Sequence, residues 1–447
     1  MAGHLPKTLF CCGFAALLAA CGKPAPRPPN VILITVDTVR ADHLACHGYP
    51  RNTMPFVERL VKDAVLFTNA YSTASWTAPS VASIATALYP REHGVLHGTV
   101  TEGKIERQET LDPSFLTLAE AMKAGGYSTF GVFSNGHMTR EMGFGQGFDV
   151  IRSLWFEKSP APNRAVAEIR SRIRESQPYF LWVHYFDPHA PYMAREPWIN
   201  VYSTNAALCR QLSGLGFQDL KNTRNTIREN PAALQALIDV YDSELGYADR
   251  SVEELFGMLE IGEDCLVVVS SDHGEQFLEH NGLYHGFTLY EPEVRVPLIV
   301  RMPARRFAGT TVAAPVSNRN ILPTILDICG IRLDAMIPGY SLLPLIHGGP
   351  APEPVYLELD RGNDWKGVRR DHWKLLCRKK SEYELFDLAS DPAEANPAAL
   401  RSPEKADELK TLLNSWLRAH PVFSSQKGPA NLSRDQKETL RSLGYLK

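Results

Sequence analysis

The sequence lacks an excess of positive charge. Its 447 residues include 47 Lys and Arg against 50 Asp and Glu, which gives a net charge of -3. Its nearest approach to a basic run is the short segment Arg378-Lys379-Lys380, which we interpret as a solvated face. Proteins that bind nucleic acid usually carry a basic patch or stripe. We therefore expect no nucleic-acid partner.

Closely spaced cysteine pairs are also missing. Five of the eight cysteines lie beyond the N-terminal leader, at positions 46, 209, 265, 329 and 377, and none of them forms a CxxC pair. Such scattered positions indicate neither a zinc ribbon nor a dense disulfide framework. The odd number leaves at least one thiol free in an oxidising compartment.

The N-terminal hydrophobic run is too short to span a membrane. It covers residues 8–20 after Lys7, whereas a spanning helix needs roughly 20 residues. The run has the size of a signal-peptide core, and Leu18-Ala19-Ala20-Cys21 resembles the lipobox of bacterial lipoproteins. The resemblance implies a signal peptide at 1–21, lipidation of Cys21 and a proline-rich tether at 22–30. The protein would then be anchored to a membrane outside the cytoplasm, in the periplasm or at the outer membrane. An ordinary secretory signal is the alternative.

Three continuous apolar runs each end in an acidic residue. They precede Asp37, Asp187 and Asp272, and unbroken apolar runs are typical of strands covered on both faces. Helix-period segments alternate with these runs, which predicts a doubly wound α/β sheet. The predicted helices are 55–65, 79–88, 115–124, 165–174 and 232–259. Because ligands in such folds bind at the carboxyl ends of the strands, the three acids could converge.

The pattern changes after about Gly349. Proline-rich residues lead into short strand-like segments beginning at Val355, Trp373 and Glu384, and a helix follows at 409–417. We therefore predict two units. A catalytic domain would cover 31–349, and a smaller α+β subdomain would cover 350–447.

A threonine stands at the start of one predicted helix. Thr77 lies two residues before Pro79, and an apolar-periodic helix follows, which places Thr77 near the N-cap. Free N–H groups and the helix dipole favour an anion there. Taken alone, these residues favour a plain threonine N-cap.

The surroundings of Thr77 change that interpretation. The segment that begins at Ser75 resembles the sulfatase signature Cys/Ser-x-Pro-Ser-Arg, with Thr77 in the first position. Other segments match in chain order at 30–43, 54–60, 67–71, 117–121, 145–149, 187–192, 271–275, 285–286, 295–300 and 384–394. Together they resemble the sulfatase family of the alkaline phosphatase superfamily. The resemblance implies an alkaline-phosphatase-like, doubly wound mixed sheet flanked by helices, and a metal-dependent hydrolase that acts on ester bonds.

The resemblance also implies a metal site. Asp37, Asp272, His273 and Thr77 would hold one divalent metal ion, and the ion would lower the hydroxyl pKa of Thr77. Calcium prefers hard oxygen ligands, whereas imidazole suits zinc or a similar transition metal. Thr38 replaces the family's second N-terminal metal carboxylate. We therefore expect zinc or manganese rather than calcium.

Two histidines resemble positions that contact the substrate. His189 and His285 would hold the oxygens of the ester or protonate its leaving group. In an alternative interpretation, Asp187, His189 and His285 build a second metal site, although the spacing of Asp187 and His189 differs from the Asp-x-x-x-His pattern of two-zinc phosphodiesterases.

Several departures from the sulfatase pattern are informative. Thr77 cannot be converted to formylglycine, because its extra methyl group makes the oxidised product a ketone. Val81 replaces the supporting signature arginine, and Val132 and Ser134 replace a family lysine and histidine. A direct threonine nucleophile resembles instead the phosphoethanolamine transferases and lipoteichoic-acid synthases of the same superfamily.

We therefore predict an ester hydrolase or group transferase that uses Thr77 as its nucleophile. Its substrates would be phosphate or phosphonate esters of small molecules, lipid head groups or glycans outside the cytoplasm. A sulfuric ester hydrolase is the first alternative. A catalytically inactive binding protein of the same fold is the second.

Overall fold

The computed structural model describes residues 27–102, 105–216, 219, 224–225, 227–362, 364–379, 381–398, 401–424 and 433–443. The predicted signal peptide at 1–21, including Cys21, lies outside the described residues, as does most of the predicted tether. Within the described part of the chain, no helix is both long and apolar enough to cross a membrane.

A mixed sheet forms the centre of the molecule. Its strands are β1 (Val31–Val36), β2 (Val65–Tyr71), β5 (Ser128–Phe133), β6 (Val150–Ser153), β7 (Tyr179–Tyr185), β8 (Leu266–Ser270), β11 (Arg295–Arg301), β12 (Thr311–Val312) and β13 (Val316–Ser317). They lie in the order β12-β2-β11-β8-β1-β7-β5-β6, with β13 also paired to β2. β1 is parallel to β7 and β8, whereas β11 is antiparallel to β2 and β8. The mixed α/β sheet predicted from the apolar runs is confirmed.

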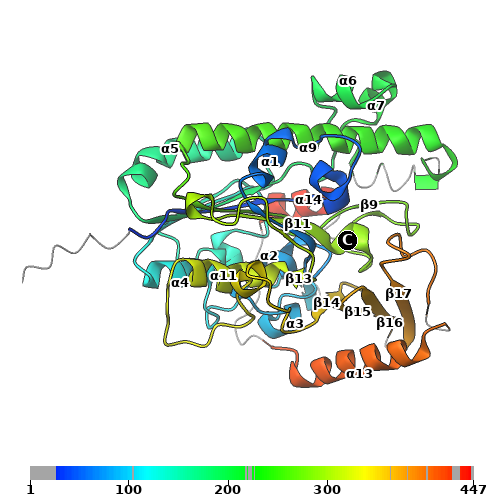
Figure 1. Cartoon of the computed structure of the whole chain (residues 1–447). Helices are drawn as coiled ribbons and strands as arrows, with labels where there is room; N and C mark the ends of the chain where they lie inside the picture. The colour runs from blue at the N-terminus through cyan, green and yellow to red at the C-terminus, as the bar shows by residue number, and fades with distance from the viewer. Residues whose placement is uncertain are drawn as a thin grey trace, which may run out of the picture.

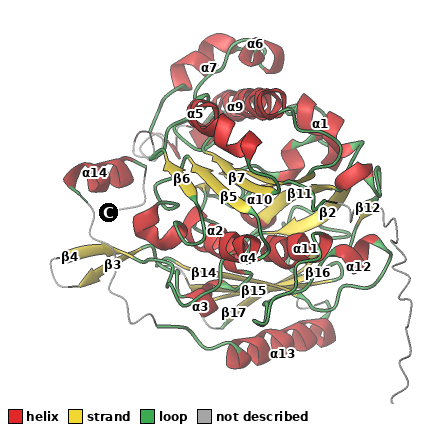
Figure 2. Cartoon of the chain, turned by 90° about the vertical axis from the view of Figure 1, so that its left-hand side faces the viewer, coloured by secondary structure: helices red, strands yellow, loops and turns green. Residues whose placement is uncertain are grey.

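Helices cover both faces of this sheet (Figures 1 and 2). One face carries α1 (Pro55–Val61), α5 (Ala161–Glu175) and the long α9 (Pro231–Leu259), and the other carries α2 (Thr77–Thr86), α4 (Leu118–Ala124) and α11 (Ile321–Ile328). The shorter elements are α3 (Pro90–His93), β3 (Thr99–Glu102), β4 (Ile105–Gln108), α6 (Trp198–Tyr202), α7 (Ala206–Leu212), β9 (Gln276–Phe277), β10 (Leu283–Tyr284), α10 (Glu291–Val294), α12 (Leu343–Ile346) and α14 (Arg434–Ser442).

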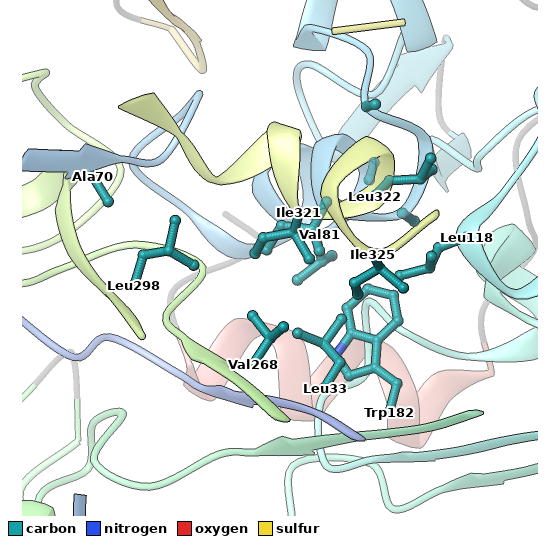
Figure 3. Close-up of a cluster of buried hydrophobic side chains, with 14 of the residues drawn as sticks. Leu33, Ala70, Val81, Leu118, Trp182, Val268, Leu298, Ile321, Leu322 and Ile325 are labelled. Carbon is teal, nitrogen blue, oxygen red and sulfur yellow. The ribbon is translucent and has the colours of Figure 1, made fainter. Parts of the chain in front are cut away.

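The side chains of β1 alternate between two hydrophobic clusters, one on each face of the sheet. Leu33 lies in the cluster that contains Val81 of α2 and Ile325 of α11 (Figure 3). Ile32 and Ile34 lie in the cluster that contains residues of α9. A strand buried on both faces needs apolar residues at every position, which explains the unbroken runs in the sequence.

A smaller antiparallel sheet follows near the C-terminus. It contains β14 (Val355–Asp360), β15 (Asp364–Arg370), β16 (Trp373–Arg378) and β17 (Glu382–Asp387), and α13 (Pro403–Ala419) packs against it (Figure 1). A buried ion pair ties this sheet to the main body, with Arg91 Nη2 3.1 Å from Glu358 Oε1. The C-terminal strands and helix expected from the sequence are present.

Local capping explains where one helix differs from its predicted bounds. α4 begins at Leu118 rather than at 115, because Thr117 is its N-cap. Thr117 Oγ1 accepts a hydrogen bond from the backbone N–H of Glu120 at 3.2 Å, and the Glu120 carboxylate accepts one from the N–H of Thr117 at 2.9 Å. This reciprocal pair satisfies two N–H groups at the start of the helix.

Candidate active site

Two carboxylates meet where neighbouring parallel strands end. Asp37 directly follows β1, and Asp272 lies two residues after β8. His273 places Nε2 3.5 Å from Asp37 Oδ1 and 3.4 Å from Asp272 Oδ2. Thr77 Oγ1 lies 3.2 Å from the same nitrogen. The structure thus brings the four predicted ligand residues together, and all four side chains are fully buried.

The chemistry of this group fits a bound cation. His273 Nδ1 lies 2.9 Å from the carbonyl oxygen of Gly274, so Nδ1 carries a hydrogen and a neutral ring presents its lone pair at Nε2. Among the residues that the structure describes, Asp37 Oδ1 and Asp272 Oδ2 are buried without a hydrogen-bond partner. Buried oxygen and nitrogen lone pairs that face one another need a cation between them, since unpaired buried charges are costly. Oxygen and imidazole donors of this kind are typical ligands of a divalent metal ion.

The two carboxylates differ in their electrostatic surroundings. Burial opposes ionisation of Asp37, but the hydrogen bond with His184 and the charges of nearby imidazoles lower its pKa to about 2. Burial and then the charge of Asp37 raise the pKa of Asp272. Ionising both of these neighbouring acids costs free energy through charge repulsion unless a positive charge lies between them.

Thr77 is the first residue of α2. Trp76 is the N-cap, with an extended backbone and no side-chain capping bond. The helix therefore starts two residues earlier than predicted, and Thr77 lies one position inside it. No acidic side chain occupies the first turn, and all ten residues of the helix are buried. The positive end of the helix dipole therefore lies at Thr77, and no acid of the helix's own first turn offsets it.

His189 and His285 lie beside this group. Their ring centroids are 4.9 Å apart, and the His285 ring is 4.3 Å from that of His273. His285 Nδ1 lies 2.9 Å from Glu275 Oε1, and the Tyr192 hydroxyl donates to Glu275 Oε2 at 2.7 Å. Burial lowers the pKa of His189 to about 4 and holds the pKa of His285 well below its usual value. Both rings are neutral at pH 7 and can each exchange one proton.

Two further residues hold Asp37, and the sequence prediction gave them no role. His184 Nε2 lies 3.3 Å from Asp37 Oδ2, and its Nδ1 lies 2.8 Å from Thr35 Oγ1. Asn135 Nδ2 donates to the same Asp37 oxygen at 2.8 Å. A histidine inside an otherwise apolar buried strand is the signal that could have identified His184. Asn135 follows β5 in a loop and carries no comparable signal.

Thr38 has a strained backbone next to Asp37. Its φ of 56° lies in the left-handed region, which β-branched residues rarely adopt and which costs about 1–3 kcal/mol. The Tyr241 hydroxyl donates to its carbonyl oxygen at 2.8 Å, and its N–H donates to Asp272 Oδ1 at 3.3 Å. Its Oγ1 is buried without a hydrogen-bond partner. Such strain is found most often where a site must hold a fixed geometry.

Valine fills two positions at which the family resemblance places cations. Val81 in α2 and Val132 in β5 are fully buried among apolar side chains. Ser134 donates its hydroxyl hydrogen to the carbonyl oxygen of Glu157. None of these three side chains brings positive charge to the site.

Asp187 has other partners than the acids at 37 and 272. Its Oδ2 accepts a hydrogen bond from the backbone N–H of Ser159 at 2.6 Å, and its Oδ1 lies 3.2 Å from Arg195 Nη2. A carboxylate already bonded to a guanidinium and an amide has little capacity left for a metal ion. This arrangement disfavours the alternative of a second metal site built from Asp187, His189 and His285.

A cavity of about 700 Å³ lies between the segment 280–288 and the C-terminal sheet. Tyr284 and Phe287, which flank the pair at 285–286, line one side of it, and Trp365 and Arg378 of the C-terminal sheet line another. Aromatic walls with polar and charged groups are typical of pockets that hold small molecules.

The chain resembles known sulfatases over most of its length. Residues 29–331 match the sulfatase family, and residues 279–420 match the family of the N-sulphoglucosamine sulphohydrolase C-terminal region. Human arylsulfatase K is 25% identical over 481 residues, which cover 90% of this chain and 84% of that protein. The choline-sulfatase of Rhizobium meliloti is 28% identical over 243 residues, covering 49% of this chain and 46% of that protein.

Solved structures share the fold at lower identity. The phosphonate monoester hydrolase of Agrobacterium radiobacter superposes with a TM-score of 0.68 at 20% identity, covering 91% of this chain and 100% of that chain. A protein solved in complex with its substrate D-glucosamine-2-N,6-O-disulfate gives the same TM-score and identity, covering 88% of this chain and 98% of that chain. These likenesses show a shared architecture.

Proposed function

The chain belongs to the sulfatase family, whose members are ester hydrolases of the sulfatase and phosphoesterase type, and on that premise we propose that Thr77 is its nucleophile. One observation carries the proposal: Thr77 Oγ1 lies 3.2 Å from His273 Nε2, within the group that contains two buried carboxylate oxygens without partners. A structural threonine at a helix start has no need of such neighbours. The same orphaned oxygens argue against a catalytically inactive binding protein.

The proposed metal site consists of Asp37, Asp272, His273 and Thr77. A divalent ion bound there supplies positive charge that lowers the hydroxyl pKa and neutralises the ester anion. His184 and Asn135 fix Asp37 through their bonds to its Oδ2. The positive end of α2 adds a further fixed partial charge next to the attacking oxygen. Zinc or manganese suits this set better than calcium, because one donor is an imidazole.

The reaction we propose has two displacements. Thr77 Oγ1 attacks phosphorus, the bond to the alcohol breaks, and a covalent Thr77 ester forms. Water or an acceptor hydroxyl then attacks the same phosphorus and releases Thr77. His285 and His189 are the groups placed to move the protons. In the first displacement a neutral ring accepts the Thr77 hydroxyl hydrogen and passes it to the leaving alcohol, and in the second it accepts a hydrogen from the incoming water or acceptor and returns it to Thr77. The hydrogen-bonded chain from Tyr192 through Glu275 orients the His285 ring for this transfer.

Phosphorus is the proposed target rather than sulfur. A phosphate monoester carries more negative charge at neutral pH than a sulfate monoester and gains more from a metal ion and a helix N-terminus. A sulfated threonine is hard to open, and Thr77 cannot expel sulfate as a formylglycine hemiacetal does. Sulfuric ester hydrolysis is the second candidate, because arylsulfatase K and choline-sulfatase are among the relatives.

We propose that the alcohol part of the substrate is a lipid head group, a glycan or a small molecule outside the cytoplasm. The cavity lined by Tyr284, Phe287 and Trp365 has room for such a group. The proposal also includes anchoring through lipidated Cys21. Cys21→Ala should release the protein from the membrane fraction, and unchanged fractionation of that variant would count against the anchor.

Matched esters provide the test. Nitrophenyl phosphate, nitrophenyl phenylphosphonate and nitrophenyl sulfate share one leaving group, so their kcat/KM values can be compared directly at saturating metal. We expect both phosphorus esters to exceed the sulfate ester, and Thr77→Ala to abolish turnover of all three while retaining the fold. A sulfate ester turned over faster than every phosphorus ester would contradict the proposal.

A further inference from the structure

Arg361 extends from the C-terminal sheet to Trp76 and Gly286. It follows the last residue of β14, in the loop that leads to β15. Its neighbour Asp360 is held 3.7 Å from His97 Nε2, and His97 Nδ1 lies 2.8 Å from Glu109 Oε1. Hydrogen bonds with Asp360 and Glu109 raise the pKa of His97 to about 10, so this ring is charged at neutral pH. The two ion pairs fix the start of the loop against the main body of the protein.

The Arg361 guanidinium lies between the two segments that carry the proposed chemistry. Its Cζ is 4.8 Å from the centroid of the Trp76 ring, and Trp76 immediately precedes Thr77. Its Nη1 is 2.9 Å from the point that a Cβ atom on Gly286 would occupy, and Gly286 immediately follows His285. Gly286 also has a φ of 79°, which disfavours any side chain there. Arg361 is therefore bracketed by the neighbours of the nucleophile and of a proton-transferring histidine.

The charge of Arg361 acts inside the site. Burial, followed by the positive charge of Arg361, lowers the pKa of the His137 ring to about 3. His137 packs edge-on against Trp76 with ring centroids 5.8 Å apart. Arg361 itself is half-buried, and charges in such positions are screened less by solvent than charges at the surface.

The proposed metal site with its ion bound has a net charge close to zero, so it attracts an anionic substrate weakly. Two carboxylates, Asp37 and Asp272, balance the charge of one divalent ion, and Val81 and Val132 contribute none. A doubly charged ester would therefore meet a centre close to neutral unless another cation approached it. Arg361 brings a guanidinium against Trp76 and Gly286, which are the chain neighbours of Thr77 and His285.

We propose that Arg361 binds the non-bridging oxygens of the reacting ester and makes the site selective for doubly charged phosphomonoesters over singly charged phosphodiesters. This inference rests on the proposed function and narrows its substrate class. A planar guanidinium can donate two parallel hydrogen bonds to such oxygens, which a lysine cannot reproduce. Stacking on Trp76 holds the guanidinium in place and lowers the entropy cost of binding.

Binding of inorganic phosphate to the full-length, metal-loaded protein tests the inference without requiring turnover. Calorimetry should show that Arg361→Gln weakens phosphate binding about tenfold or more, as expected for loss of charge-assisted hydrogen bonds. Arg361→Lys should bind with intermediate affinity. Arg59→Gln is the matched control, because Arg59 also stacks on an aromatic ring, at 5.4 Å from Phe56, but is 56% exposed on α1. Arg59→Gln should bind phosphate with the same affinity as the unsubstituted protein.

Kinetics with two phosphorus esters provide a second readout. Arg361→Gln should reduce kcat/KM for a nitrophenyl phosphate monoester at least fivefold more than for a bis(nitrophenyl) phosphate diester. A difference on the order of fivefold or more is expected when one charge-assisted hydrogen bond to the monoester is lost. Equal losses on both esters, or phosphate affinity equal to that of the unsubstituted protein, would overturn the inference. Absence of phosphate binding to the unsubstituted protein would overturn it too. Preference for sulfate esters would instead refute the proposed function, while phosphate binding would still decide the role of Arg361.

Discussion

Two buried clusters of charge lie at the carboxyl ends of neighbouring strands, and they are built in opposite ways. The first, after β1 and β8, contains Asp37 and Asp272 with two oxygens that have no hydrogen-bond partner. The second, after β7, joins Asp187, Glu244, Lys158 and Arg195. In this second cluster Lys158 Nζ lies 2.7 Å from Glu244 Oε1, and Arg195 Nη2 lies 3.2 Å from Asp187 Oδ1 and 3.3 Å from Glu244 Oε1. We call them the open cluster and the closed cluster.

The two clusters differ in whether every charged group has a partner, and this difference separates a ligand-binding site from a structural network. The closed cluster balances two positive charges against two negative ones, and Lys158 also donates to the carbonyl oxygen of His189 at 2.7 Å. Such a network stabilises the loop that carries His189 but has no capacity left for a ligand. The open cluster is costly in an empty protein, because its carboxylates are desolvated without compensation. The difference predicts opposite responses to substitution.

The largest expected effect comes from removing a charge at the open cluster. Asp272→Asn should lower activity roughly 1,000-fold or more, because loss of the metal removes several kcal/mol of transition-state stabilisation. Metal analysis of the purified variant should find the ion absent or greatly depleted. The thermal midpoint of the metal-free protein should stay constant or rise, since one buried charge that repels Asp37 is gone.

Asp187→Asn is the matched change after the neighbouring strand. It should retain the metal and lower the thermal midpoint, because it leaves Arg195 with one buried partner fewer. Loss of metal from Asp187→Asn, or retention of full metal content by Asp272→Asn, would reverse the assignment of the two clusters.

The next largest effect concerns the closed cluster. At pH 8 and above, where Glu244 of the parent protein is ionised, Lys158→Met should lower the free energy of unfolding by about 3–5 kcal/mol, since it leaves buried Glu244 without its closest cation. Denaturant titration measures this directly. The control Lys123→Met breaks an exposed pair with Asp149, at 2.6 Å, and should cost less than about 1 kcal/mol. Equal costs for the two variants would show that the closed cluster carries no special stability.

Glu244 should give the closed cluster a pH dependence. Burial raises the pKa of Glu244 from 4.5 to about 7 against the opposing charge of Lys158. Because the folded pKa is the higher one, the stabilising contribution of Glu244 is complete below pH 4.5 and is lost as pH rises through 7. The stability of the parent protein relative to Glu244→Gln should therefore fall by at most about 3 kcal/mol between pH 4.5 and 8. A difference that stays flat or increases over this range would contradict the assignment.

The smallest expected effect comes from substituting His184, which contacts the open cluster at Asp37. His184 contacts Asp37 through Nε2 and Thr35 through Nδ1, so we regard it as a positioning residue. His184→Asn should weaken metal affinity about 10- to 100-fold, as is usual when a partner of a metal ligand is removed. Competition with a chelator measures this. His43→Asn changes another buried histidine, paired with Asp242 at 2.8 Å, and should leave metal affinity unchanged.

The sequence predicted the open cluster better than its surroundings. Apolar runs that end in acids located Asp37 and Asp272, because strand ends in a doubly wound sheet share one edge. The same rule pointed to Asp187, whose carboxylate instead bonds to Arg195. Strand position says where an acid lies but not which residues from other loops will pair with it. Those partners depend on contacts between distant segments.

Arg361 is a second residue whose partners could not be predicted from the sequence. It lies in the C-terminal sheet, far from Thr77 along the chain, and no local pattern distinguishes it from other surface arginines. Its position against Trp76 depends on how the small sheet packs beside the helices below the main sheet (Figure 2). The helix α2 starts at Thr77, two residues earlier than predicted, for a local reason. Trp76, a residue with no capping side chain, takes the N-cap position because its backbone is extended.

The stereochemical course at phosphorus tests the central claim most directly. A phosphorothioate monoester made chiral at phosphorus with two oxygen isotopes would be hydrolysed by the metal-loaded protein in water of the third isotope, and the configuration of the thiophosphate product determined. Attack by Thr77 followed by attack of water comprises two in-line displacements. We therefore predict net retention of configuration, and no turnover by Thr77→Ala. Net inversion would mean that water attacks the ester directly, and Thr77 would then not be the nucleophile.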